Sequence, residues 1–280
     1  MPLAWNRYGK ARIRLVKLQR VARAHELVDL TIDVQLEGAY EAVYVDGDNR
    51  SCLPTDTMKN SVYALARQEP IDHVETFAVR LAEHFARKPA VSVVRISASE
   101  HRWDRLDVPG RPDHHAFIQP GLEERTTEIV RSSRGTRIRS GLKNLIVSKT
   151  SFSSFEGFLR DDYTTLDANT DRILATSVTA EWQYREGIAD FAVRERIRQA
   201  LIATFAAHDS RSVQHTLYAM GEAALAACSD VSELTLSLPN RHHLLVNLQP
   251  FGLDNPNDVF VATEEPYGLI EATVRRSESQ

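Results

Sequence analysis

The chain has 280 residues, enough for one large domain or two of ordinary size, and enough apolar content for a full core. Its formal net charge of −4 argues against non-specific binding to nucleic acid or to an anionic membrane. Its two cysteines, Cys52 and Cys228, form no pattern, so we expect neither a disulfide framework nor a thiolate metal cluster.

The first part of the chain shows the patterns of β-strands. Residues 10–21 alternate partly between basic and apolar side chains, and residues 26–37 place most of their apolar side chains on one face, as a half-buried antiparallel strand does. A third, short strand is predicted at residues 42–45. Thr55 and Asp56 then offer an N-cap for a first helix through residue 67, and Pro70 separates it from a second helix at 71–87. Strands return at 91–98 and 115–119.

The second half of the chain repeats this order. We predict strands at 141–149 and 173–184, helices at 191–207 and 212–228, and strands at 233–238 and 244–248. Two local echoes occur in the same order: F-A-V-R begins at both Phe77 and Phe191, and V-S-V-V-R-I-S-A at Val91 is matched by V-S-E-L-T-L-S-L at Val231. The sequence therefore predicts an α+β protein of two tandem repeats, residues 1–135 and 136–280.

Each repeat should form an antiparallel sheet with helices on one face. The uncovered face and the open sheet edges then need a partner, and a second subunit can supply it. We therefore expect an oligomer.

The segment from Lys149 to Arg172 combines aromatic, polar and turn-forming residues without a regular apolar period. Such a segment suits a surface that holds a flat polar ligand through a stacking ring, an arginine fork and hydroxyl groups. A plain loop with a few anchoring aromatic residues is the simpler alternative.

Other candidate residues each have an ordinary structural explanation. Lys10 fits a solvated strand edge, and Thr55 with Asp56 fits a helix cap. Val213 and Gln214 follow Ser212 in the first turn of a helix, where unpaired backbone amides can bind an anion. Adjacent histidines point to opposite faces of a strand, so at most one of the pair at 242–243 can face a given site.

Several common signatures are missing. The chain has no convincing set of metal-ligating residues, and it lacks G-x-G-x-x-G, P-loop and G-x-S-x-G motifs. No apolar run is long enough to span a membrane, and the first residues lack the apolar core of a signal peptide. The last residues, S-E-S-Q, are not a peroxisomal address, so we expect a cytoplasmic protein.

Taken together, these pieces resemble the urate oxidase (uricase) family from about Asn6 to Pro250. The matching motifs are R-Y-G-K at Arg7, P-T-D-T-M-K-N at Pro54, the K-T-S-F…F-E-G-F-L-R-D-D-Y-T-T-L…D-R-I-L stretch from Lys149, S-V-Q at Ser212 and L-P-N-R-H at Leu238. Ser148 departs from the aliphatic residue usual before the lysine, and the missing peroxisomal address fits a bacterial-type member.

The resemblance implies a homotetramer of tunnel-fold (T-fold) subunits that oxidises urate with O2 and water to 5-hydroxyisourate and hydrogen peroxide. It implies no metal and no organic cofactor, with O2 as co-substrate, and no nucleic-acid or membrane partner. The active sites would lie at subunit interfaces. The implied catalytic residues are Lys10, Thr55 and His242, as a proton relay.

The implied substrate-binding residues are Thr55, Asp56, Phe155, Leu166, Arg172, Val213, Gln214 and Asn240. One subunit would supply Lys10, Thr55 and Asp56, and its neighbour the rest. In this scheme Phe155 stacks on urate, Leu166 forms a wall and Arg172 holds the ligand, while Phe152, Phe158 and Tyr163 anchor the turn.

Two alternatives stay open at this point. One is a non-catalytic purine-binding oligomer, which would have no need of the relay residues. The other is a metal-dependent tunnel-fold enzyme that converts pterin or GTP, which would need a histidine set for zinc.

Overall fold

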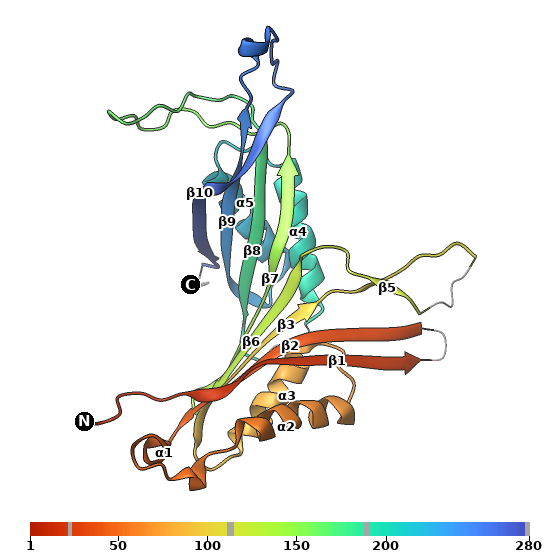
Figure 1. The fold of residues 1–280 in the computed structure, drawn as a ribbon, viewed down its shortest axis with the longest axis vertical. Helices are drawn as coiled ribbons and strands as arrows, with labels where there is room; N and C mark the ends of the chain where they lie inside the picture. The colour runs from red at the N-terminus through yellow and green to blue at the C-terminus, as the bar shows by residue number, and fades with distance from the viewer. Residues whose placement is uncertain (22–23, 111–114, 188–190, 278–280) are drawn as a thin grey trace. The chain divides into compact units, whose positions relative to one another are not determined.

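The structure is a computed structural model that describes residues 1–21, 24–110, 115–187 and 191–277 (Figure 1). The chain divides into two compact units. The first comprises Met1–Leu142 with Gln183–Phe191, and the second comprises Lys143–Trp182 with Ala192–Gln280. Each unit is described by itself.

The first unit contains a sheet and two long helices. Strands β1, β2, β3 and β6 are neighbours in that order and pair antiparallel, and β4 pairs with β5 in a separate small sheet. The elements are β1 (Tyr8–Val21), β2 (Ala24–Gly38), α1 (Glu41–Val45), η1 (Asn49–Ser51), α2 (Thr55–Gln68), α3 (Val74–Ala86), β3 (Val91–His101), β4 (Asp104–Arg105), β5 (Phe117–Ile118) and β6 (Glu124–Ser132).

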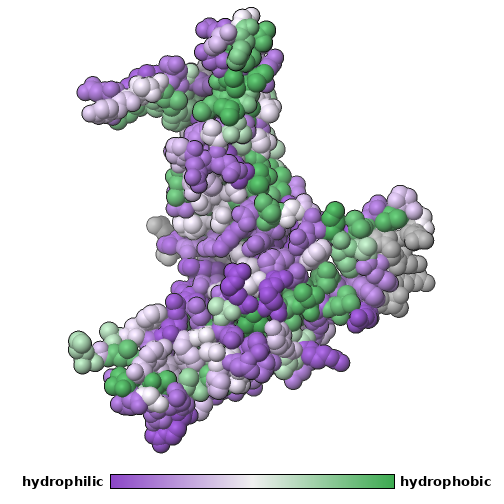
Figure 2. Space-filling model, viewed as in Figure 1, coloured by the Kyte–Doolittle hydropathy of each residue, from purple (hydrophilic) through white to green (hydrophobic). Residues whose placement is uncertain are grey.

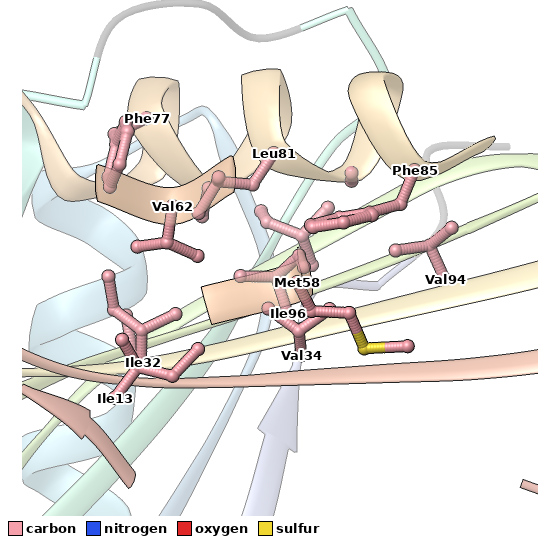
Figure 3. Packing of buried hydrophobic residues seen from close by; sticks show 14 of the residues in the cluster. Ile13, Ile32, Val34, Met58, Val62, Phe77, Leu81, Phe85, Val94 and Ile96 are labelled. Atoms are coloured by element: carbon pink, nitrogen blue, oxygen red, sulfur yellow. The ribbon is translucent and has the colours of Figure 1, made fainter. Parts of the chain in front are cut away.

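Helices α2 and α3 pack on one face of this sheet (Figure 3). Alternate residues of the strands point toward the helices, as the period of a strand requires. Each large apolar side chain buried in this way stabilises the fold by about 1.5–3 kcal/mol. The labelled core residues, all at most 3% exposed, are Ile13, Ile32, Val34, Val94 and Ile96 from the strands and Met58, Val62, Phe77, Leu81 and Phe85 from the helices.

The second unit repeats the order of the main elements, two strands, two long helices and two strands. They are β7 (Gly135–Lys149), β8 (Leu174–Tyr184), α4 (Val193–Ala207), α5 (Val213–Ala227), β9 (Val231–Leu245), η2 (Gln249–Phe251) and β10 (Phe260–Arg275). β7 and β8 contribute residues to both units, and the strand order is β1-β2-β3-β6-β7-β8-β9-β10. Strands β9 and β10 pair antiparallel, and α5 packs closely on them, since a Cβ on Gly221 would lie 2.5 Å from a methyl of Val274.

The predicted order of two strands, two helices and two strands occurs twice, but several boundaries were wrong. Residues 42–45 form part of helix α1 instead of a strand. The strand predicted at 115–119 is reduced to the two residues of β5, and the strands predicted at 233–238 and 244–248 are parts of one strand, β9. Helices α3 and α4 begin later than predicted, at Val74 and Val193.

Strands β6 and β10 were not predicted. β6 is largely polar, and β10 is mostly exposed and interrupted by Pro266 and Gly268, so neither shows clean alternation. The N-cap of α2 is Pro54, so Thr55 and Asp56 lie inside the helix and the predicted side-chain cap is absent there.

Candidate active site

Lys10 lies next to an irregularity in strand β1. It pairs with Val34 of β2, and the register shifts immediately after it. Arg12 has a φ of 56°, and its backbone N–H donates to the Asp33 carboxylate at 2.6 Å. On the other side, a Cβ on Gly9 would lie 1.9 Å from the Val34 carbonyl oxygen, so only glycine allows this close pairing. The backbone on both sides therefore determines the position of Lys10.

The N-terminus of α2 presents backbone amides close to Lys10. No side chain caps the helix, and its first backbone bond runs from the Met58 N–H to the Pro54 carbonyl, 3.2 Å. The amides of Thr55 and Asp56 precede that bond, at the positive end of the helix dipole.

The Asp56 carboxylate is engaged beside these amides. It forms an ion pair with Lys59 and accepts a hydrogen bond from the Asn60 amide at 3.1 Å. The hydrogen bond from Lys59 is the main cause of a lowered pKa of the Asp56 carboxyl, and the charge of Lys10 lowers it further. Thr55 and Asp56 are thus neighbours at the start of α2, and the charge of Lys10 is near enough to act on Asp56.

The aromatic segment 151–172 is a loop that folds back on itself. The Phe155 N–H donates to the Asn169 carbonyl at 2.7 Å, and the Asn169 N–H donates back to Phe155 at 3.1 Å. The Arg172 N–H donates to the Ser153 carbonyl at 2.7 Å. These bonds place Arg172 beside Phe155, although the two residues are well separated in sequence.

Arg172 is a half-buried cation whose donors are not all used. Its guanidinium carbon lies 5.2 Å from the centre of the Phe155 ring, and the Phe155 ring also stacks on Phe158 with the ring centres 5.0 Å apart. Burial lowers the pKa of Arg172. Its Nε is buried and has no hydrogen-bond partner among the described residues. A buried, unpaired donor on a cation is costly, and an anion placed against it would remove that cost.

The loop is fastened to the start of α5 by Ser210. The Ser154 N–H donates to the Ser210 carbonyl at 2.7 Å, and the Ser210 N–H donates to the Phe152 carbonyl at 2.9 Å. The buried Ser210 hydroxyl accepts from Thr216 at 2.7 Å and donates to the Ser212 carbonyl at 3.1 Å. Phe152 and Ser154 precede Phe155 in the loop. Their two backbone bonds to Ser210 therefore hold the loop against the segment that leads into α5.

That first turn begins as the sequence predicts. Ser212 is the N-cap and its hydroxyl accepts from the His215 N–H at 3.1 Å. Val213 is buried and Gln214 is exposed. The Val213 amide and the Gln214 side chain are therefore presented on the turn that Ser210 joins to the Phe155–Arg172 loop.

Asn240 and His242 lie on one face of β9. The Asn240 Nδ2 and the His242 Nδ1 are 3.4 Å apart. Opposite them the register of β10 is irregular between Thr263, which pairs with His242, and Gly268, which pairs with Asn240. The neighbouring His243 instead points its Nδ1 at the Arg241 carbonyl, 3.2 Å away.

Not every predicted role holds. Leu166 is 55% exposed within this chain, so its role as a wall of a site shared between subunits stays a prediction. Phe152 and Tyr163 are 70% and 92% exposed and do not anchor the turn, because backbone bonds and the stacked Phe158 do so. Sequence reasoning also missed Ser210, which has no local signal beyond a serine before a helix.

Two kinds of feature are absent from the described residues, a metal-binding cluster and a membrane-spanning helix. Within the described residues, no three or more His, Cys, Asp or Glu side chains are grouped so that they could hold a metal ion. No helix in the described part of the chain is long and apolar enough to cross a membrane.

Comparison with known proteins gives consistent matches. The family model described as Uricase matches residues 6–130 and 138–271. The uricase of Arthrobacter globiformis is 45% identical over 99% of this chain and 91% of its own length, and that of Aspergillus flavus is 36% identical over 97% and 96%. The crystal structure of the Arthrobacter globiformis uricase matches with a TM-score of 0.94 and 44% identity, covering all of this chain and 96% of that one.

A uricase from Bacillus fastidious, 24% identical, has a TM-score of 0.82 and shows a likeness of fold. The predicted fold class, an α+β protein of tandem repeats with an antiparallel sheet and helices on one face, is confirmed by these similarities.

Proposed function

The chain belongs to the uricase family, and we propose that it oxidises urate with O2 and water to 5-hydroxyisourate and hydrogen peroxide. It is thus an oxidoreductase. Two electrons pass from the purine to O2, which leaves as peroxide, and the oxygen of water becomes the new hydroxyl group. The electron-rich purine, once deprotonated, can reduce O2 directly, so the proposed reaction needs neither a metal nor an organic cofactor.

The observation that carries the binding proposal is the half-buried guanidinium of Arg172 beside the Phe155 ring, whose buried Nε has no partner within the described part of the chain. Urate is a planar anion at neutral pH. A guanidinium fork can hold its carbonyl and ring-nitrogen edge with two charge-assisted hydrogen bonds, while an aromatic ring stacks on its face. Gln214 offers both a donor and an acceptor for the same edge, and the Val213 amide offers another donor.

We assign the proton chemistry to Lys10, Thr55 and His242. Lys10 polarises the Thr55 hydroxyl, which removes a proton from urate or from the attacking water, and His242 orients Lys10 and passes protons onward. The Asp56 amide, at the start of α2, binds a ring heteroatom. Asn240, 3.4 Å from His242, holds O2 and later water above the ring.

The site is assembled from two copies of the chain in a homotetramer. Lys10, Thr55 and Asp56 belong to the first compact unit, and Phe155, Arg172, Val213, Gln214, Asn240 and His242 belong to the second. Strands β1 and β10 end the strand order, so both have an edge available to a neighbour. Exposed apolar side chains on β9 and β10 support the same conclusion (Figure 2); they include Leu244, Leu245, Val261 and Leu269.

We place the boundary between the repeats near residue 135, where β7 begins.

The reaction is tested by following the loss of the urate ultraviolet band while peroxide is measured, with and without a chelator. We expect one peroxide for each urate at an unchanged rate with chelator. No loss of urate would identify a non-catalytic purine binder, and loss abolished by chelator would identify a metalloenzyme.

The shared site is tested by complementation. Under this proposal, Lys10→Met and Arg172→Ala chains each have little activity when urate is kept well below saturation. When they are unfolded and refolded together, random mixing gives about a quarter of the sites both native residues. Partial recovery of activity is expected, and no recovery would place both residues in one chain's site.

A further inference from the structure

A histidine pair stands directly behind the proposed substrate-binding turn. His208 is the C-cap of α4 and His215 is the third residue of α5. The His208 Nε2 and the His215 Nδ1 are 3.1 Å apart, and the ring centres are 4.3 Å apart at an interplanar angle of 61°. The pair therefore closes the connection between the two helices.

This connection carries the ligand groups of α5. Between the two histidines lie Ser210, which holds the Phe155–Arg172 loop, and Val213 and Gln214. His215 fastens the turn twice, by its ring to His208 and by its backbone N–H to the Ser212 hydroxyl. Loss of the ring contact would leave the turn with one of these two attachments.

The hydrogen bonds assign the proton in the pair. The Arg211 backbone N–H points at the His215 Nδ1 at 3.5 Å, so this nitrogen is the acceptor. The His208 Nε2 then carries the hydrogen and donates it. The contact requires a neutral His215 ring, because a doubly protonated imidazole has no acceptor nitrogen.

The surroundings oppose added positive charge. The Lys149 ammonium of β7 donates to the His208 carbonyl, and His215 lies in the first turn of α5, at the positive end of the helix dipole. Burial, His215 and Lys149 lower the pKa of His208, against the opposing charge of Asp209. Asp209 and Asp171 likewise partly offset the burial that lowers the pKa of Lys149.

We propose that His208 and His215 are positioning residues that hold the Val213–Gln214 turn in its urate-binding form while their two facing nitrogens share one hydrogen, and release it on acidification. This inference rests on the proposed function, because it concerns the same substrate turn. A second hydrogen on the facing nitrogens leaves no acceptor between the rings, so the contact is present at neutral pH and is lost as the pH falls.

The kinetic test compares the Michaelis constant for urate at pH 7.5 and 5.5 in the native protein and in His215→Gln. Glutamine can still accept a hydrogen bond but does not titrate. Loss of the hydrogen bond between the rings corresponds to about a fivefold rise of the Michaelis constant on acidification, with the turnover number changing less. The rise should disappear in His215→Gln. His84→Gln is the control, because His84 of α3 also has a pKa lowered by burial but belongs to the first compact unit and has no part in the connection between α4 and α5.

The second test needs no catalysis. Hydrogen exchange of the backbone amides at 210–216 is measured over the same pH range, after correction for the intrinsic exchange rate, and should lose protection on acidification in the native protein but keep it in His215→Gln. Equal pH dependence of exchange in both proteins would overturn the proposal. Exchange that follows the prediction in a protein that does not oxidise urate would refute the proposed function and leave the histidine contact standing.

Discussion

Replacing Arg172 by methionine should separate urate binding from stability. Methionine keeps much of the aliphatic volume and removes the guanidinium fork. Charge-assisted hydrogen bonds are worth about 1.5–3 kcal/mol each. Because Arg172 is only half-buried, we take the lower value for each of the two bonds that the fork makes to urate, about 3 kcal/mol in total. That corresponds to affinity weakened about 100-fold.

The stability of the ligand-free protein should change little. Arg172 has a buried Nε without a partner among the described residues, so removing it also removes an uncompensated desolvation cost. The variant also loses the contact between the guanidinium and the Phe155 ring, which lowers the free energy of unfolding by about 0.5–1 kcal/mol. We expect a net change below about 1 kcal/mol in the free energy of unfolding.

The assay measures urate affinity by equilibrium titration without O2, so that no turnover occurs, and stability by thermal unfolding without urate. Arg160→Met is the matched control, since Arg160 lies 5.1 Å over the neighbouring Phe158 ring but is exposed. Arg172→Met that binds urate normally and unfolds at a much lower temperature would show that Arg172 is a structural residue.

Three further results are expected. Lys10→Met should lower the turnover number by about 100-fold or more and leave anaerobic urate binding nearly unchanged, as for a general-base component; full turnover would rule out the relay. Gly9→Ala should cost more than about 2 kcal/mol, because its Cβ would lie 1.9 Å from the Val34 carbonyl oxygen, whereas Gly121→Ala, with nothing within 4 Å, should be nearly neutral in thermal unfolding. Ser210→Ala should cost about 1–3 kcal/mol by leaving the Thr216 hydroxyl unpaired, and should also raise the Michaelis constant for urate; an unchanged constant would separate this network from the substrate turn.

Local sequence patterns predicted the elements with strong periodicity. The alternating apolar residues of β2 and the N-capped start of α5 are signals within a few residues of one another, and both elements formed as expected. The valines at 43 and 45 favoured a strand by local preference, but the backbone after the buried Tyr40 turns into α1. Strands β6 and β10 lack clean apolar alternation, so their sequences alone did not reveal them.

The sequence by itself determined the family, the repeated order of elements and the identity of the candidate site residues. Motifs and apolar periodicity are patterns over residues that are close together in the chain, so they can be recognised without the tertiary structure. Only the tertiary structure decided what those residues do locally. It placed the Arg172 guanidinium beside Phe155 with a buried Nε, and it left the Phe152 and Tyr163 side chains exposed to solvent. It also brought His208 into contact with His215 at the substrate turn. Burial and hydrogen-bond partners arise from contacts between distant segments, and these contacts set the desolvation and the proton positions on which binding depends.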